Sequence, residues 1–189
     1  QPTMMKEMET LLHLHDDGSF SLNLDYFQYH LHPTEPMSSK TVDLLGPQRH
    51  PVAKFAPFSD DEGVRNASLQ YANLAASAQL RLEQSLLHLV EHAKRETGAE
   101  NLCLAGGVAL NACANRRIAE SGLFSKIWTQ PAAGDAGGAL GAALWAWHIV
   151  KENDGRQPQQ ISLGRAWSPE KIKEFLDDFG MKYTNERNG

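Results

Sequence analysis

Two short turns rich in glycine and alanine hold the residues best suited to contact a ligand. The first is AGGV at residues 105–108, and the second is AAGDAGG at residues 132–138; each follows an apolar, strand-like run and precedes a helix-like run. Because Gly106 and Gly107 lack a Cβ, the backbone can approach a ligand closely there, and the first N–H groups of the helix point toward it. Phosphate or adenosine would suit this turn. The alternative is that the glycines only allow the helix to pack closely against the strand.

Three polar residues in or after these turns are candidate ligand contacts. Asp135 lies among residues too small to shield its carboxylate, which can bind a divalent metal near phosphates or cap the helix that follows. One carboxylate does not make a metal site, so further ligands are required. Asn111 and Asn115 lie one turn apart on the helix after the first turn. Both can hydrogen-bond a ligand, or Asn111 can cap its own helix.

Histidine pairs are the other candidates for metal binding, and their positions argue against that role. His88 and His92 have the i, i+4 spacing of metal-binding helices, but both lie away from the apolar stripe of their helix. No HExxH glutamate accompanies them, so we expect them to face solvent or an outer neighbour. The remaining pairs are expected at the surface: His13 with His15, and His30 with His32.

Hydrophobic periodicity and turn residues predict the elements before the two turns. These are a helix over 1–12, a β-hairpin over 12–24 around an Asp-Gly turn, irregular chain with a short helix near 40–46, and a long helix over 61–97. Gly98 closes the long helix, and Asp60 and Asp61 complement the charge at its start. The predicted apolar stripe of this helix consists of Ala75, Ala78, Leu82, Leu86, Leu89, Val90 and Ala93.

The same signals predict an alternating α/β arrangement around and after the two turns. The expected elements are a buried strand over 101–104, a helix over 110–120, a strand over 126–130, a helix over 138–150, a polar linker over 151–160, and a helix from Pro169 to Gly180 followed by a strand start at 181–183. The helix over 138–150 is apolar all round, which predicts that it lies inside a larger body. Cys103 and Cys113 are expected to be reduced core thiols.

Composition excludes several classes of partner. The chain has 189 residues, of which 41% are hydrophobic and 22% charged, and a net charge of -5, so it lacks the basic surface that binds nucleic acid or anionic membranes. No apolar run reaches the roughly 18 residues of a membrane span, and no signal peptide is recognisable. We therefore expect a cytoplasmic protein with neither nucleic acid nor membrane as partner. Because the chain starts at Gln1 without an initiator Met, we also expect a piece of a longer polypeptide.

Two segments around the turns resemble the O-carbamoyltransferase family, which includes nodulation, cephalosporin and tobramycin carbamoyltransferases. They are LCLAGGVALNACANRRI, starting at Leu102, and GLFSKIWTQPAAGDAGGALGAAL, starting at Gly122. A looser resemblance extends over DGSFSLNLDYFQYHL at 17–31 and SLGRAWSPEKIKEFL at 162–176. It therefore covers most of the chain.

The resemblance implies a fold and a domain organisation. The fold is α/β: the C-terminal half of an ASKHA domain (actin and sugar-kinase-like, RNase H-like), with a mixed sheet flanked by helices and a small N-terminal hairpin. Residues 1–150 would form this part, 151–161 a linker, and 162–189 the start of the region that bears a YrdC-like domain. The other half of the ASKHA domain and the YrdC-like domain would be partners in the same polypeptide.

The resemblance also implies an activity and the residues that serve it. Such enzymes use ATP and carbamoyl phosphate to make carbamoyl adenylate, then transfer the carbamoyl group to a hydroxyl of a small molecule. The nucleotide contacts would be Gly106, Gly107, Val108, Ala109, Leu110, Asn111 and Gly134, and Asp135 would bind an iron-like divalent metal. The family's metal-binding HxxxH motif precedes this part of the domain, and HLVEH at 88–92 occupies a different place. We therefore expect the chain to be inactive alone.

Two other functions fit the same sequence features. One is a non-catalytic ASKHA-like module that binds a nucleotide or regulates another protein. The other is a different ASKHA phosphotransferase, such as a sugar kinase. An HxxxH motif before this segment and a YrdC-like segment after it would favour carbamoyl transfer.

Overall fold

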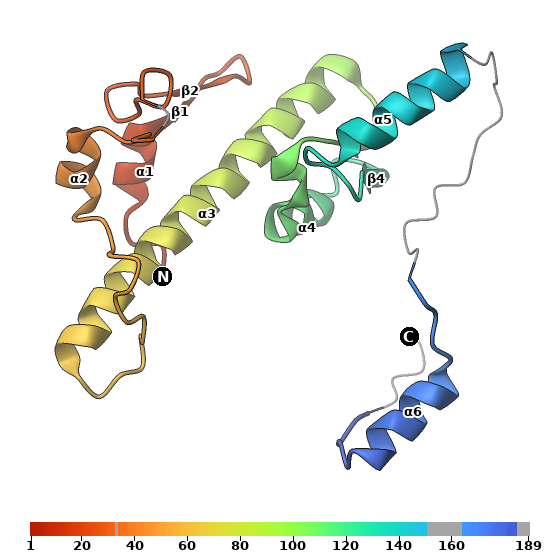
Figure 1. Cartoon of the computed structure of the whole chain (residues 1–189). Coiled ribbons are helices and arrows are strands. Elements are labelled where there is room, and N and C mark those ends of the chain that lie inside the picture. The colour runs from red at the N-terminus through yellow and green to blue at the C-terminus, as the bar shows by residue number, and fades with distance from the viewer. Residues whose placement is uncertain (33, 151–163, 185–189) are drawn as a thin grey trace. The chain divides into compact units, whose positions relative to one another are not determined.

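The computed structural model describes residues 1–32, 34–150 and 164–184, and it divides into two compact units, residues 1–142 and 143–189 (Figure 1). The polar linker predicted at 151–161 lies outside the described residues. The first unit begins with helix α1 (Met5–Leu11), the hairpin strands β1 (Leu12–Leu14) and β2 (Phe20–Leu22), and helix α2 (Ser39–Leu45). These confirm the predicted N-terminal helix, hairpin and short helix.

Helix α3 (Glu62–Thr97) is the long helix that supports the rest of the first unit. It begins where the Asp61 carboxylate accepts a hydrogen bond from Val64 N at 3.0 Å. It ends at Gly98, which has a left-handed conformation with a φ of 63°. Both ends agree with the prediction because each depends on a local signal, a carboxylate cap at the start and a glycine at the end.

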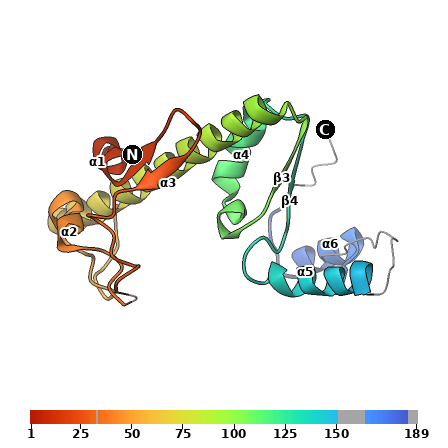
Figure 2. The same cartoon turned by 90° about the horizontal axis from the view of Figure 1, so that it is seen from above.

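Two different faces of α3 carry its neighbours, as Figures 1 and 2 show. The first face contacts the N-terminal segment: Ser77 Oγ accepts a hydrogen bond from Met4 N at 3.0 Å, and Arg81 Nη2 donates one to Leu12 O at 2.6 Å. Helix α4 (Ala112–Glu120) packs on the other face, beside Gln79. At 100° per residue, Ser77 and Gln79 point in nearly opposite directions, so α3 is covered on two sides.

The predicted apolar stripe of α3 is only partly correct. Ala75 and Ala78 are exposed, whereas the fully or nearly buried residues of the helix are Ser68, Ser77, Ser85 and Val90. The serines are buried because their hydroxyls donate to the carbonyl one turn earlier. Two of them also accept a hydrogen bond from the preceding chain: Ala56 N to Ser68, and Met4 N to Ser77. A small hydroxyl side chain therefore lets the N-terminal segments approach the helix closely.

Strands β3 (Asn101–Leu104) and β4 (Lys126–Thr129) form a parallel pair. In sequence, the connection between them contains a 3-10 helix, η1 (Gly107–Leu110), and helix α4. Figure 2 shows the two strands side by side. The strand and helix predictions are confirmed, but β3 is not buried: Asn101 and Cys103 are exposed. In the described part of the chain β3 pairs only with β4, and Asn101 and Cys103 share the face of this pair that stays exposed. Cys103 and Cys113 are free exposed thiols, so the prediction of core thiols is wrong.

Helix α5 (Gly137–Trp145) follows the second turn and continues as a π-helix, η2 (Ala146–Val150). No residue of either element is buried by the described chain, so the larger body that was predicted to enclose this apolar helix is not formed by the described residues. In the second unit, helix α6 (Pro169–Asp178) begins at Ser168, whose hydroxyl accepts a hydrogen bond from Lys171 N. The expected strand at 181–183 is not formed.

The architecture is therefore mixed α/β, with two small sheets flanked by helices in the described residues. The parallel and antiparallel pairs are separate and do not join into the expected mixed sheet. Among the described residues, no helix is both long enough and apolar enough to cross a membrane.

Candidate functional site

The two glycine-containing turns meet at the carboxyl ends of β3 and β4. Gly106 N donates a hydrogen bond to Ala133 O at 2.9 Å, which joins one turn to the other. Gly134 lies against the first turn: a Cβ there would be 3.7 Å from Leu110 Cδ1 and 3.8 Å from Gly107 Cα. The carboxyl edge of adjacent parallel strands is where open α/β sheets bind ligands. The sequence-predicted residues of both turns thus form one continuous surface.

The first turn presents some of its residues outward and buries others. Gly106 has a φ of 95° and a ψ of 158°, a conformation that is essentially restricted to glycine. Val108 and Leu110 are 50% and 56% exposed, and no atom lies within 4 Å of the position of a Cβ on Gly107. Ala109 is buried at 7% exposure, so only its backbone can contribute to a ligand. From Ala105 to Leu110, every residue except Ala109 is therefore exposed.

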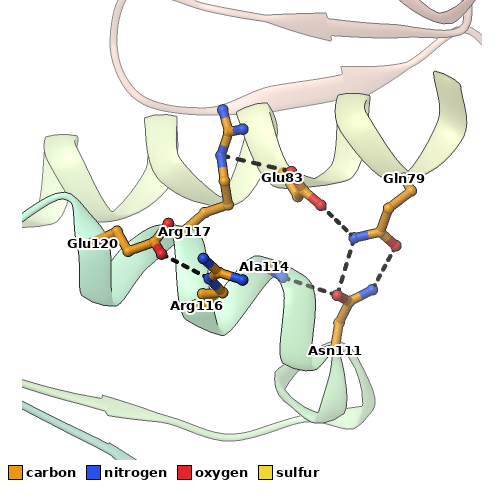
Figure 3. Close-up of polar contacts among 7 residues, drawn as sticks. All are labelled: Gln79, Glu83, Asn111, Ala114, Arg116, Arg117 and Glu120. Atoms are coloured by element: carbon orange, nitrogen blue, oxygen red, sulfur yellow. Dashed lines mark hydrogen bonds and ion pairs between the residues drawn. The ribbon is translucent and has the colours of Figure 1, made fainter. Parts of the chain in front are cut away.

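Asn111 and Asn115 fix the carboxyl end of this turn. Asn111 Oδ1 accepts a hydrogen bond from Ala114 N at 3.0 Å, so Asn111 caps α4, one of the two roles that its sequence position suggested. The same side chain forms a reciprocal pair with Gln79 of α3, through Asn111 Nδ2 to Gln79 Oε1 at 2.9 Å and Gln79 Nε2 to Asn111 Oδ1 at 3.1 Å (Figure 3). Asn115 Nδ2 donates to Ala109 O at 2.7 Å. Both asparagines therefore hold the turn itself.

Charged residues of α3 and α4 continue this network. Gln79 Nε2 also donates to Glu83 Oε1 at 2.8 Å, and Glu83 Oε2 lies 3.6 Å from Arg117 Nε (Figure 3). Sequence reasoning missed Gln79 and Glu83. The available signal was their i, i+4 spacing on the side of α3 opposite Ser77. On the outer side of α4, Glu120 accepts a hydrogen bond from Arg116 Nε at 2.7 Å, which raises the pKa of that guanidinium.

Asp135 in the second turn is exposed, and its carboxylate does not cap helix α5. The Asp135 backbone carbonyl accepts a hydrogen bond from Gly138 N at 3.1 Å, but in the described residues its carboxylate accepts none from the start of α5. The side-chain cap considered for Asp135 is therefore not formed. Asp135 is exposed and directly follows Ala133 and Gly134, the two residues through which the second turn contacts the first.

A hard divalent cation would find one suitable oxygen ligand here. Asp135 fits that chemistry, but over residues 1–32, 34–150 and 164–184 no three His, Cys, Asp or Glu side chains are grouped to hold a metal. His88 and His92 are engaged elsewhere: the His88 ring hydrogen-bonds His15 O at 2.8 Å, and His92 packs against Gly18. The expectation that these two histidines face an outer neighbour is confirmed, and that neighbour is the hairpin.

Comparison with known proteins identifies the family. Residues 3–144 match the family model described as carbamoyltransferase N-terminus, which includes both turns. An uncharacterized protein of Synechocystis sp. is 42% identical over 175 residues, which are 89% of this chain and 26% of that protein. Nodulation protein NolO of Bradyrhizobium diazoefficiens is 51% identical over 102 residues, 53% of this chain and 18% of NolO. Nodulation protein U of Azorhizobium caulinodans is 33% identical over 109 residues, 56% of this chain and 19% of that protein.

These matches also define how much of each relative the chain represents. It spans 26% of the Synechocystis protein and 18% of NolO. The matched region nevertheless includes the α3 scaffold, the parallel pair and both turns. The chain belongs to the carbamoyltransferase family, as its resemblance implied.

Proposed function

We propose that this chain supplies one wall of the ATP site of an O-carbamoyltransferase with an ASKHA-type domain. The observation that carries the proposal is the contact between two glycine-containing turns at the carboxyl ends of β3 and β4, within the region that matches the carbamoyltransferase model. Glycine turns at this edge allow a phosphate chain to approach backbone N–H groups. Such groups neutralise charge that develops during phosphoryl and acyl transfer.

The proposed reaction has two stages. ATP, carbamoyl phosphate and water give carbamoyl adenylate, pyrophosphate and inorganic phosphate. A hydroxyl oxygen of the acceptor then attacks the carbamoyl carbon, the bond to AMP breaks, and the hydroxyl proton passes to a base. The exposed residues Gly106, Gly107, Val108 and Leu110 would contact the nucleotide, with Gly134 beside them. Ala109 is buried beneath these residues, and Asn111 holds the end of the turn by capping α4.

Asp135 is proposed to hold a divalent metal together with ligands from other parts of a longer polypeptide. When bound, such an ion would polarise a carbamoyl or phosphoryl oxygen. Asp135 itself would contribute an exposed, negatively charged oxygen ligand to that ion. Since the chain spans 26% or less of these relatives, we propose that catalysis needs further segments and that the 189 residues alone do not transfer carbamoyl groups.

Replacing Asp135 with asparagine tests the metal contact. In the complete polypeptide, Asp135→Asn should lower ATP-dependent carbamoyl transfer about 100-fold and reduce bound metal, because a neutral amide is a weaker ligand for a hard cation. The assay follows the label of carbamoyl phosphate into a hydroxyl acceptor and the release of AMP, and elemental analysis measures the metal. Asp43→Asn, at an exposed aspartate of α2, is the control and should change neither. Loss of transfer with unchanged metal content would remove Asp135 from the ligand set, and transfer by the isolated 189 residues would contradict the need for further segments.

Adjacent glycines in the first turn test the nucleotide contact. Gly107→Ala should leave stability within about 0.5 kcal/mol, since its new Cβ enters open space, but should weaken binding of a fluorescent ATP analogue by roughly ten-fold if the nucleotide occupies that space. Gly106→Ala should instead cost about 1–3 kcal/mol of unfolding free energy, because alanine is strained at a φ of 95°. Urea unfolding and equilibrium titration separate the two effects. Unchanged affinity in Gly107→Ala would place the nucleotide elsewhere.

A further inference from the structure

A chain of polar side chains connects α3 to the carboxyl end of the first turn. In order, it consists of Arg117, Glu83, Gln79 and Asn111, and it ends at Ala114 N (Figure 3). Glu83 has a side chain only 12% exposed, and Gln79 and Asn111 are half-buried. At such positions a mispaired polar group is costly, so the arrangement has one favoured hydrogen-bonding pattern.

The direction of every hydrogen bond in this chain follows from Glu83. An ionised carboxylate can only accept, so the amide nitrogen of Gln79 must face it. The Gln79 Oε1 atom then faces Asn111 and requires the Asn111 nitrogen as donor. That orientation leaves Asn111 Oδ1 toward Ala114 N, where it caps α4. A carboxylate on the long helix thus sets the orientation of an amide at the end of the candidate nucleotide turn.

We propose that Gln79 and Glu83 are positioning residues that hold the nucleotide turn in its binding conformation. This inference rests on the proposed nucleotide site. Asn111 directly follows η1, and its fixed side chain anchors the end of the turn from which Val108 and Leu110 point outward. Gln79 is 32 residues before Asn111 in the sequence. The hydrogen bonds between the two residues therefore attach the end of the turn to the distant helix α3. Without the anchor, the turn would exchange between conformations and only a fraction would bind the nucleotide.

The test replaces Gln79 with methionine, which keeps the length of the side chain but removes both hydrogen bonds to Asn111. We expect about ten-fold weaker binding of a fluorescent ATP analogue to the complete polypeptide, and faster hydrogen exchange of the amides at 106–111. Gln70→Met is the matched control, an exposed glutamine of the same helix without a hydrogen bond in the described residues, and should match the wild type. Titrations are made where each variant is fully folded, so that a purely structural effect does not alter the affinity.

A double variant tests the direction of the network. Gln79→Glu combined with Glu83→Gln places an acceptor-only group opposite Asn111 Nδ2 and lets the new amide at position 83 donate to it. The bond from Asn111 Nδ2 returns, but the second carboxylate oxygen at position 79 faces Asn111 Oδ1, where Gln79 Nε2 donated in the wild type, so the affinity should lie between those of the wild type and of Gln79→Met. Gln79→Glu alone places two carboxylates side by side and should bind more weakly than the double variant. If the wild type binds and Gln79→Met binds equally well with unchanged exchange, the positioning role is wrong while the nucleotide site stands. If the wild type itself does not bind, the proposed nucleotide site in this chain is contradicted, and the positioning role with it.

Discussion

Replacing Gly18 with alanine should detach the hairpin from α3 and lower the unfolding free energy of the first unit by about 2–4 kcal/mol. Gly18 is buried at the hairpin turn, with a φ of 83°, and a Cβ there would overlap the Cβ and imidazole ring of His92. The overlapping atoms lie next to the α3 backbone, so His92 cannot move aside by changing the end of its side chain. Because the hairpin can instead separate from α3, the loss is limited to the stability that its docking provides. Urea unfolding measures it.

A second glycine separates strain from overlap in this experiment. Gly98 also has a positive φ, 63°, but its Cβ position has no atom within 4 Å. Gly98→Ala should therefore cost only the left-handed backbone term, about 1 kcal/mol. The hydrogen bond between the His88 ring and His15 O gives a further readout, since amide exchange at the hairpin should rise in Gly18→Ala alone. Equal losses in the two variants would show that the hairpin does not pack on His92.

Elements bounded by local signals were predictable from the sequence. The Asp-Gly turn of the hairpin closes through His15 N to Ser19 O at 2.9 Å, and Asp17 Oδ1 accepts bonds from both the backbone and the hydroxyl of Ser19. These bonds lower the pKa of the Asp17 carboxyl. The start and end of α3 were likewise determined by Asp61 and Gly98. Each of these interactions spans a few residues, so residue type and spacing contain the necessary information.

Features that depend on packing partners were not predictable. The stripe expected on α3 assumed one buried apolar face, but the helix contacts the N-terminal segment on one side and α4 on the other. Ser77 is buried because Met4, 73 residues earlier in the sequence, donates a backbone hydrogen bond to its hydroxyl. No residue pattern within the helix predicts that contact. The exposure of Cys103 has a similar origin, since it depends on whether another element packs on that face of the strand pair.

The candidate site shows the same division. That the turns at 105–108 and 132–138 would meet could be expected, because both follow strands and the carboxyl ends of neighbouring parallel strands share one edge. The contacts of Gly106 with Ala133 and of Gly134 with Leu110 show that the two turns do meet. The supporting pair of Gln79 and Asn111 joins two elements 32 residues apart. A single sequence gives no indication of which face of α3 receives α4.

Replacing Gly137 with alanine should disrupt the second turn and, with it, the proposed nucleotide site. A Cβ on Gly137 would overlap the Ala132 carbonyl oxygen, a backbone atom that moves only if the turn opens. The same turn carries Asp135, and its Ala133 carbonyl accepts the hydrogen bond from Gly106 N. We therefore expect a loss of about 2–4 kcal/mol in urea unfolding together with loss of detectable binding of the ATP analogue.

The neighbouring glycine gives a control with an effect of opposite sign. Gly138 lies in the same first turn of α5, and no atom lies within 4 Å of its Cβ position. Gly138→Ala should thus stabilise the helix by roughly 0.5–1 kcal/mol, since alanine loses less conformational entropy there. Both substitutions restrict the unfolded chain equally, so the difference between them measures only the contact with Ala132. If Gly137→Ala stabilised the protein as Gly138→Ala is expected to do, there would be space for a Cβ between Gly137 and the Ala132 carbonyl oxygen. The close approach of the second turn to the first would then have another cause.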